Sequence, residues 1–162
     1  MTYKRICTVV LLCFMSFQLY AQVTLPVARN IQAAFDKNTR TASGKPGDNY
    51  WQNSAVYNLQ LNFNPSTRLI SGKVDIDYTN HSPDTLNEIV FKLFTDLYKA
   101  GAMRVFPIEE QDVSKGMSVE NIIINNEPQD AAKTVIRGTN MIVPVKALLP
   151  GQKIHFFIQY AY

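Results

Sequence analysis

Two consecutive stretches alternate apolar and polar residues with a period of two, and this alternation constrains the fold more than any other feature. The apolar positions are Tyr57, Leu59, Leu61 and Phe63 in the first stretch, and Ile70, Val74, Ile76 and Tyr78 in the second. Because successive side chains of a strand point to opposite faces, each stretch predicts a half-buried strand with one wet face. The turn sequence Asn64-Pro65-Ser66-Thr67 joins the two, so together they predict a β-hairpin.

Four further strands are expected after this hairpin. They cover Thr85–Phe94, Ser118–Asn125, Lys133–Val145 with a possible break near Gly138, and a last run with Ile154, Phe156, Ile158 and Tyr160 on one side. The segment 95–112 is expected to be irregular, and Leu149–Gln152 fits a type II turn. Short strands with closely spaced turns predict an all-β fold, either an antiparallel β-sandwich or a curved open sheet.

Aromatic residues are frequent in this part of the chain. They are Tyr50, Trp51, Tyr57, Tyr78, Phe91, Phe94, Tyr98, Phe106, Phe156, Phe157, Tyr160 and Tyr162. Most of them fall on apolar faces at strand spacing, so we expect core packing rather than an exposed platform for sugars.

Residues 1–21 have the pattern of a secretory signal peptide. Lys4 and Arg5 precede an apolar run from Ile6 to Phe17, and Ala21 supplies a small residue at the exit. The run is short for a bilayer, which makes an uncleaved membrane anchor the weaker alternative. We therefore expect an exported chain, in the periplasm, at the cell surface or outside the cell, with no membrane span after removal of the signal.

Removal of this segment would also remove both cysteines, Cys7 and Cys13. The mature chain would then form no disulfide, and it would have no cysteine nucleophile and no cysteine-ligated metal. Without Lys4 and Arg5 it carries 14 basic and 13 acidic residues, against 16 and 13 in the whole chain. This balance gives no basic face of the kind that binds nucleic acid.

The 162-residue chain is expected to have one main domain. Residues 22–49 read as a polar N-terminal segment and linker, with a short helix within Val27–Lys37 and linker chemistry over Thr39–Asp48. The main β domain is expected to cover residues 50–162.

Few residues suit catalysis or metal binding. The two histidines, His81 and His155, lie 74 positions apart, so neither belongs to a zinc pair at helical spacing. His81 is expected to be solvated in a turn, and His155 to lie on the outer face of the last strand. The sequence also lacks H-E-x-x-H, G-x-S-x-G and G-x-G-x-x-G motifs. We therefore assign no catalytic, cofactor-binding or metal-binding residue.

Two groups of acidic residues offer alternative sites. Asp75 and Asp77 alternate with Lys73, which favours a solvated strand face over a calcium or acid–base site. The cluster Glu109, Glu110 and Asp112 lacks the ligand spacing of a calcium loop. A glycosylation sequon also occurs at Asn80-His81-Ser82, directly before Pro83.

Several motifs in order resemble the N-terminal domain of gluzincin aminopeptidases, the relatives of aminopeptidase N and leukotriene hydrolase, and most of all their secreted bacterial branch. The resemblance covers about Tyr50 to Tyr162. The motifs are Tyr50-Trp51-Gln52-Asn53, Val56–Leu61, Ile70–Asn80, Ser82-Pro83-Asp84-Thr85-Leu86, Ile89–Leu93, Val119–Asn125 and Leu148-Leu149-Pro150-Gly151-Gln152.

The resemblance implies a saddle-shaped β domain that precedes a thermolysin-like catalytic domain. In that family an H-E-x-x-H motif and a downstream Glu hold zinc, and a G-x-M-E-N stretch binds the substrate's amine. The run Gly116–Asn121 imitates the latter, but two residues separate Met117 from Glu120, and we read Glu120 and Asn121 as strand residues. The chain itself is then not an enzyme. Zinc, peptide substrate and catalytic domain belong to the longer parent, and Tyr162 would be an early end within the β domain.

The alternative is a self-contained exported β-sandwich that acts as a binding or adhesion module. The all-β pattern, the many aromatic residues and the lack of a catalytic set motivate this alternative.

Overall fold

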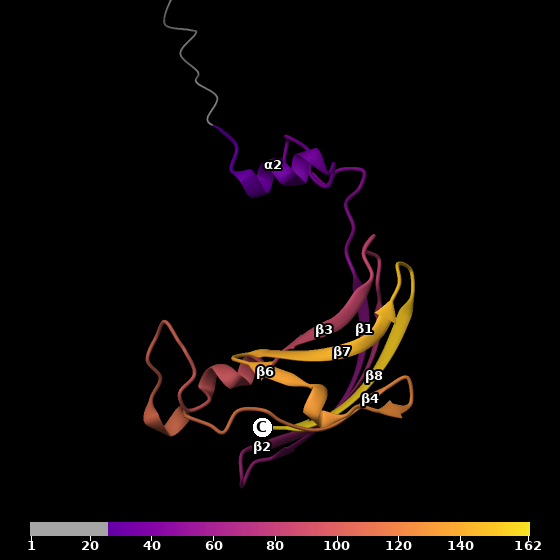
Figure 1. Cartoon of the computed structure of the whole chain (residues 1–162). Coiled ribbons are helices and arrows are strands. Elements are labelled where there is room, and N and C mark those ends of the chain that lie inside the picture. The colour runs from indigo at the N-terminus through magenta and orange to yellow at the C-terminus, as the bar shows by residue number, and fades with distance from the viewer. Residues whose placement is uncertain (1–25) are drawn as a thin grey trace, which may run out of the picture. The chain divides into compact units, whose positions relative to one another are not determined.

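The computed structural model describes residues 26–162, which contain one α-helix and eight β-strands (Figure 1). The expected signal peptide, with Cys7 and Cys13, lies outside the described residues. The chain divides between Tyr50 and Trp51 into two compact units, each described by itself below. Within the described part, no helix is long and apolar enough to cross a membrane.

The first unit contains α2 (Arg29–Asp36) and a tight turn that folds back onto its end. Ile31, Ala34 and Phe35 are its partly buried positions, as their spacing on one helix face predicts. The segment that follows is no extended linker. Arg40 forms a bridge with Pro46, and the Thr39 backbone N–H donates to the Ala34 carbonyl at 3.0 Å.

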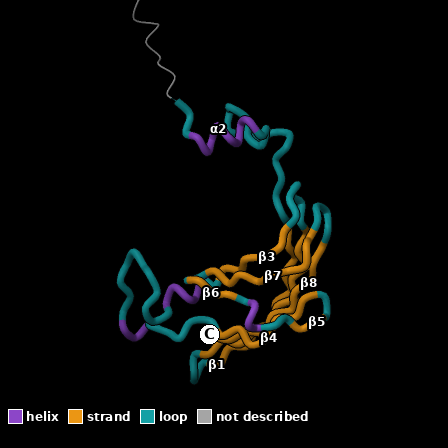
Figure 2. The backbone as a smooth tube through the Cα atoms, in the orientation of Figure 1, coloured by secondary structure: helices purple, strands orange, loops and turns teal. Residues whose placement is uncertain are grey.

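The second unit consists of two antiparallel sheets (Figures 1 and 2). The larger has five strands in the order β1 (Ser54–Asn64), β2 (Leu69–Thr79), β8 (Lys153–Ala161), β4 (Ser118–Ile124) and β5 (Glu127–Pro128). The smaller has the order β3 (Leu86–Lys92), β7 (Asn140–Leu148) and β6 (Val135–Arg137). Every pairing is antiparallel, which confirms the predicted all-β class.

The predicted hairpin is present as β1 and β2, paired without interruption from Ser54–Thr79 to Asn64–Leu69. Its turn is closed by the Asn64 side chain, whose Oδ1 accepts from the Ser66 backbone N–H at 3.0 Å. This hydrogen bond explains why an Asn-Pro-Ser sequence reverses the chain at this position.

The run predicted as one strand over 133–145 is instead two strands, β6 and β7. The chain turns between them at Gly138, where φ is +59°. A positive φ favours glycine, so the turn lies at Gly138, where the sequence indicates a possible break in the strand. The 3-10 turn η4 (Ala131–Lys133) leads into β6.

The core lies between the two sheets. Its centre is Phe156 of β8, fully buried, which meets the Phe91 ring of β3 edge-on with 5.1 Å between ring centroids. The other buried apolar residues are Val74, Ile76, Ile89, Leu93, Ile122, Met141, Val143, Leu148, Ile154 and Ile158. Most of them come from alternate positions of their strands, as period-two patterning requires. The exceptions are Leu93, which directly follows β3, and Leu148, which lies beyond the register shift between β3 and β7.

A buried asparagine fastens two connections of the fold to each other. Asn80 is fully buried, and its amide N–H groups donate to the backbone carbonyls of Asp84 at 2.8 Å and Leu148 at 3.0 Å. Its Oδ1 accepts from the backbone N–H and the hydroxyl of Ser82. The sequon asparagine thus holds the β2–β3 connection against the end of β7, with both amide hydrogens in use.

A long excursion joins β3 to β4 and includes the 3-10 turns η2 (Phe94–Tyr98) and η3 (Glu110–Asp112). Its base is held by Asp96, a buried side chain whose Oδ1 accepts from the Met117 backbone N–H at 2.6 Å. Gly116 has a φ of +78°, and a Cβ there would lie 2.6 Å from the same oxygen. The base of the excursion is therefore fixed by a position that only glycine fits.

Candidate functional site

The inner face of the five-stranded sheet is the face that carries the core residues. It is buried at β2 and β8 but exposed at the edge strand β1. Leu59, Val74 and Ile158 are neighbours on adjacent strands β1, β2 and β8. Leu59 is 52% exposed, whereas Val74 and Ile158 are 7% and 5% exposed. Burial thus ends between β2 and β1, although the three side chains point to the same face.

The inner-facing side chains of β1 form what we call the β1 apolar row: Tyr57, Leu59, Leu61 and Phe63. Their exposed fractions lie between 52% and 62%. The prediction of a half-buried first strand is therefore wrong for this face. The physical reason is coverage: the buried residues of the core come from β2, β8, β4 and the three-stranded sheet, and β1 adds only Ala55, which is partly buried.

The apolar surface continues from the row onto neighbouring strands through Gly72. A Cβ at Gly72 would lie 2.8 Å from both the Leu61 side chain and the Tyr160 ring, so these two side chains close over the glycine. Tyr160 stacks on Tyr162 with 6.5 Å between ring centroids. Burial, and then the neighbouring Tyr162, raise the pKa of Tyr160 above its ordinary value.

The size of this surface is functionally informative. An aromatic side chain covers about 150–250 Å², so four large side chains that are half exposed leave roughly 400 Å² of apolar area in water. Single exposed hydrophobic residues are ordinary, but a contiguous patch of this size is typical of an interaction site. The β1 apolar row is therefore a candidate docking surface.

A second set of exposed apolar residues lies on the β3–β4 excursion. Met103 and Phe106 are 97% and 78% exposed, and Phe94, Leu97, Tyr98, Val105 and Val113 are also exposed. Arg104 stiffens this excursion, because its guanidinium donates to the Leu97 and Lys99 carbonyls.

The expectation that most aromatic residues pack in the core is wrong for a large group. Tyr50, Trp51, Tyr57, Phe94, Tyr98, Phe106 and Tyr162 are all exposed. They occupy segment ends, the β3–β4 excursion and the uncovered strand β1, places that local alternation does not distinguish from core positions.

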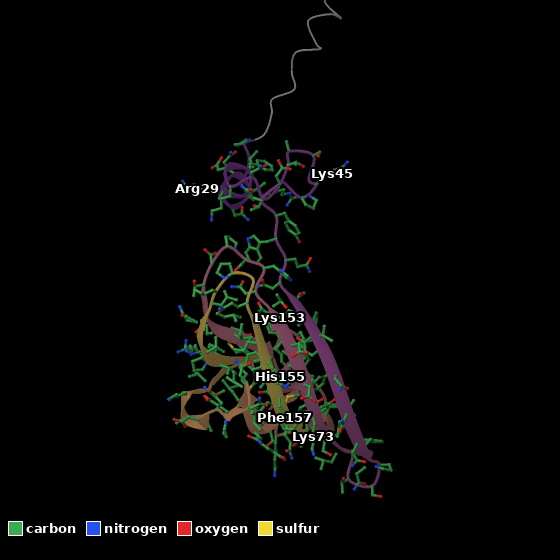
Figure 3. All side chains as sticks on the ribbon, turned by 90° about the vertical axis from the view of Figure 1, so that its right-hand side faces the viewer. Arg29, Lys45, Lys73, Lys153, His155 and Phe157 are labelled. Atoms are coloured by element: carbon green, nitrogen blue, oxygen red, sulfur yellow. The ribbon has the colours of Figure 1, made fainter. Side chains whose placement is uncertain are left out.

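The outer face of the same sheet is polar, and Figure 3 looks onto it. His155 lies there between two carboxylates: its Nδ1 is 2.9 Å from Asp77 Oδ1 and its Nε2 is 3.4 Å from Asp75 Oδ1. The two predicted features, the outward histidine and the acidic pair, thus come together. Both ring nitrogens face carboxylates. Residues 26–162 hold no group of three or more His, Cys, Asp or Glu side chains that could bind a metal ion.

The remaining candidates lie apart from one another. His81 is exposed, and its Nε2 is 3.0 Å from the Ser54 hydroxyl. Glu109, Glu110 and Asp112 lie exposed at η3. Glu120, from the lookalike motif, is a strand residue of β4 as predicted, and it accepts a hydrogen bond from Gln159.

A groove of about 770 Å³ opens between the β4–β5 hairpin and the strands β7 and β8. Its walls combine apolar residues such as Pro144 and Ile154 with charged Glu127, Lys146 and Lys153. The volume lies in the range of ligand sites, and the mixed lining suits a polar ligand with an apolar part.

The sequence matches no protein-family model and no curated protein.

Proposed function

We propose that the chain comprises the non-catalytic N-terminal β domain of an exported zinc aminopeptidase, as its motif order across Tyr50–Tyr162 suggests. In the parent protein this domain frames the substrate cleft and packs on the catalytic domain, which supplies the zinc ligands. The observation that carries the proposal is the β1 apolar row. The row consists of large apolar side chains of the kind found in a core, and these side chains remain in water unless another domain covers them.

The side-chain pattern fits a domain interface better than a surface in permanent contact with water. Leu59 and Leu61 are the central members of the row, flanked by the aromatic Tyr57 and Phe63. Interface cores favour this combination of aromatic and aliphatic side chains without charge. In the parent, the row would bury a share of its roughly 400 Å² of apolar surface against the catalytic domain.

The gene offers the first test. The proposal predicts that the reading frame continues past the codon for Tyr162 and encodes H-E-x-x-H with a downstream Glu. It also predicts that the exported product contains zinc and releases N-terminal residues from peptides. A stop codon at that point, with no such motif encoded downstream, overturns the proposal.

A second candidate is a self-contained exported binding module, favoured by the groove beside β7. Lys146 and Lys153 together with Glu127 would engage a polar ligand, while Pro144 and Ile154 would contact its apolar part. Binding of small glycans or peptides to the purified chain, lost in a Lys146→Glu variant and retained in a Lys73→Glu variant, supports this function. Lys73 provides the control because it lies on the outer sheet face.

A further inference from the structure

The edges of the two sheets are protected at three of four places. At one end of the larger sheet, β5 has two residues, one of them Pro128, and the part of β4 that β5 does not cover carries Glu120 at a register irregularity. In the smaller sheet, β6 has three residues and ends at Arg137, while β3 carries Glu88 and Lys92 and has an irregular register at its start. Short length, proline, charge and bulges are the devices that keep an edge strand from pairing with another chain.

The fourth edge, β1, has none of these devices. It is eleven residues long, its register with β2 is unbroken, and the sequence SAVYNLQLNFN contains no charge, proline or glycine. In the described chain it is bonded to β2 alone. Such an edge presents a regular row of backbone donors and acceptors to another strand.

The sequence of this edge is also nearly palindromic. About Gln60, Leu59 mirrors Leu61, Asn58 mirrors Asn62, and Tyr57 mirrors Phe63. A palindromic strand is self-complementary in an antiparallel pair, which is the symmetry of a two-fold interface. Other strands would fit the backbone equally well, but a second copy of this strand also matches the side chains of residues 57–63.

We propose that two copies of the chain pair through β1 in antiparallel register about Gln60, which joins their five-stranded sheets into one of ten strands. Leu59 then lies opposite Leu61 of the second copy, and Tyr57 lies opposite its Phe63. Aromatic and aliphatic cross-strand pairs of this kind stabilise sheets. On the other face Asn58 meets Asn62 of the second copy and the two Gln60 side chains meet, so amides meet amides and no charges are brought together.

The inference goes beyond the proposed function, because it uses the edge of β1 and leaves the inner face open. The interface is small, with an apolar contribution below that of standard interfaces, so we expect a reversible dimer. The proposed register places Gln60 on the two-fold axis, which makes this residue the most informative one to change.

The test is sedimentation equilibrium of the purified chain from about 1 µM to about 1 mM, which spans the range of weak dimers. We expect a monomer–dimer equilibrium that Gln60→Lys weakens at least about tenfold, since like charges then face each other. A mixture of the Gln60→Lys and Gln60→Glu chains should associate more tightly than either alone. Ser71→Lys adds the same charge to the outer face of β2 and should leave the equilibrium unchanged.

Cross-linking tests the register itself. In a background in which Cys7 and Cys13 are replaced by Ser, Gln60→Cys should form a disulfide-linked dimer on oxidation, because directly opposite residues have Cα atoms about 4.5–5.5 Å apart. Ser71→Cys should remain monomeric. A monomer at every concentration, species larger than dimers, or a Gln60→Lys chain that associates like the original overturns the proposal.

Discussion

Leu59→Ala and Ile158→Ala compare an open and a covered position on one rung of the larger sheet. Both side chains flank Val74 on the inner face, with Leu59 on β1 and Ile158 on β8. Leu59 already has 52% of its surface in water, and Ile158 only 5%. Burying a leucine fully is worth about 1.5–3 kcal/mol, so half-burial gives a loss of roughly 1 kcal/mol for Leu59→Ala.

Removal of the same kind of side chain from a packed core also leaves a cavity. Ile158→Ala should therefore cost about 2–5 kcal/mol. Equilibrium unfolding in urea, on dilute protein, measures both free energies of unfolding. Equal losses for the two variants would refute the conclusion that β1 lies outside the core, as would a loss at Leu59 above about 2 kcal/mol.

Three other predictions follow from the contacts described above. Asn80→Ala removes a buried amide with four hydrogen bonds, so it should lower the free energy of unfolding by about 2–4 kcal/mol. Equilibrium unfolding in urea measures this loss, and a loss near zero would contradict the role of Asn80 in holding the two connections together. Gly116→Ala should cost at least about 1 kcal/mol more than Gly101→Ala, because both have positive φ but only the former places a Cβ against Asp96; equal losses would disprove the clash. Burial raises the pKa of Tyr78 above its ordinary 10.0, so the stability contributed by its neutral phenol is present below about pH 10 and is lost as the pH rises through the folded pKa. Absorbance titration of the folded chain should show late-ionising tyrosines that include Tyr78 and Tyr160, and the folded Tyr78→Phe variant should show one fewer; an unchanged number would contradict the shift.

Much of the fold follows from local sequence patterns. Each strand of the β1–β2 hairpin and the last strand β8 has alternation that fixes its face, and the turn residues fix the ends. Glycine at position 138 divides β6 from β7, because the turn needs a positive φ there.

Whether the apolar face of a strand is covered by the rest of the fold could not be predicted from local patterns. Leu59 and Ile158 carry the same pattern, and only the sheet order places one at an edge and the other at the centre. That order depends on β8 pairing between β2 and β4, which are distant in the sequence. The sequence pattern thus predicts the β1 apolar row correctly as one face of the strand, whereas the prediction that this face is buried is wrong.

For the polar residues, too, local patterns predict the orientation of a side chain but not its long-range contacts. The outward placement of His155 follows from its strand parity, whereas its position between Asp75 and Asp77 depends on the register of β8 against β2. Burial of Asn80 depends on Leu148, a residue 68 positions away. No local signal in the sequence marks either contact.

The most direct test of the proposed docking role is hydroxyl-radical footprinting of the β1 apolar row. Tyr57, Leu59, Leu61 and Phe63 should be labelled strongly in the dilute isolated chain, in keeping with their exposure. In the intact exported product of the gene the same four side chains should be protected, while Val56 on the outer face stays labelled. Equal labelling of the row in both samples would contradict the proposal that a catalytic domain packs on this face.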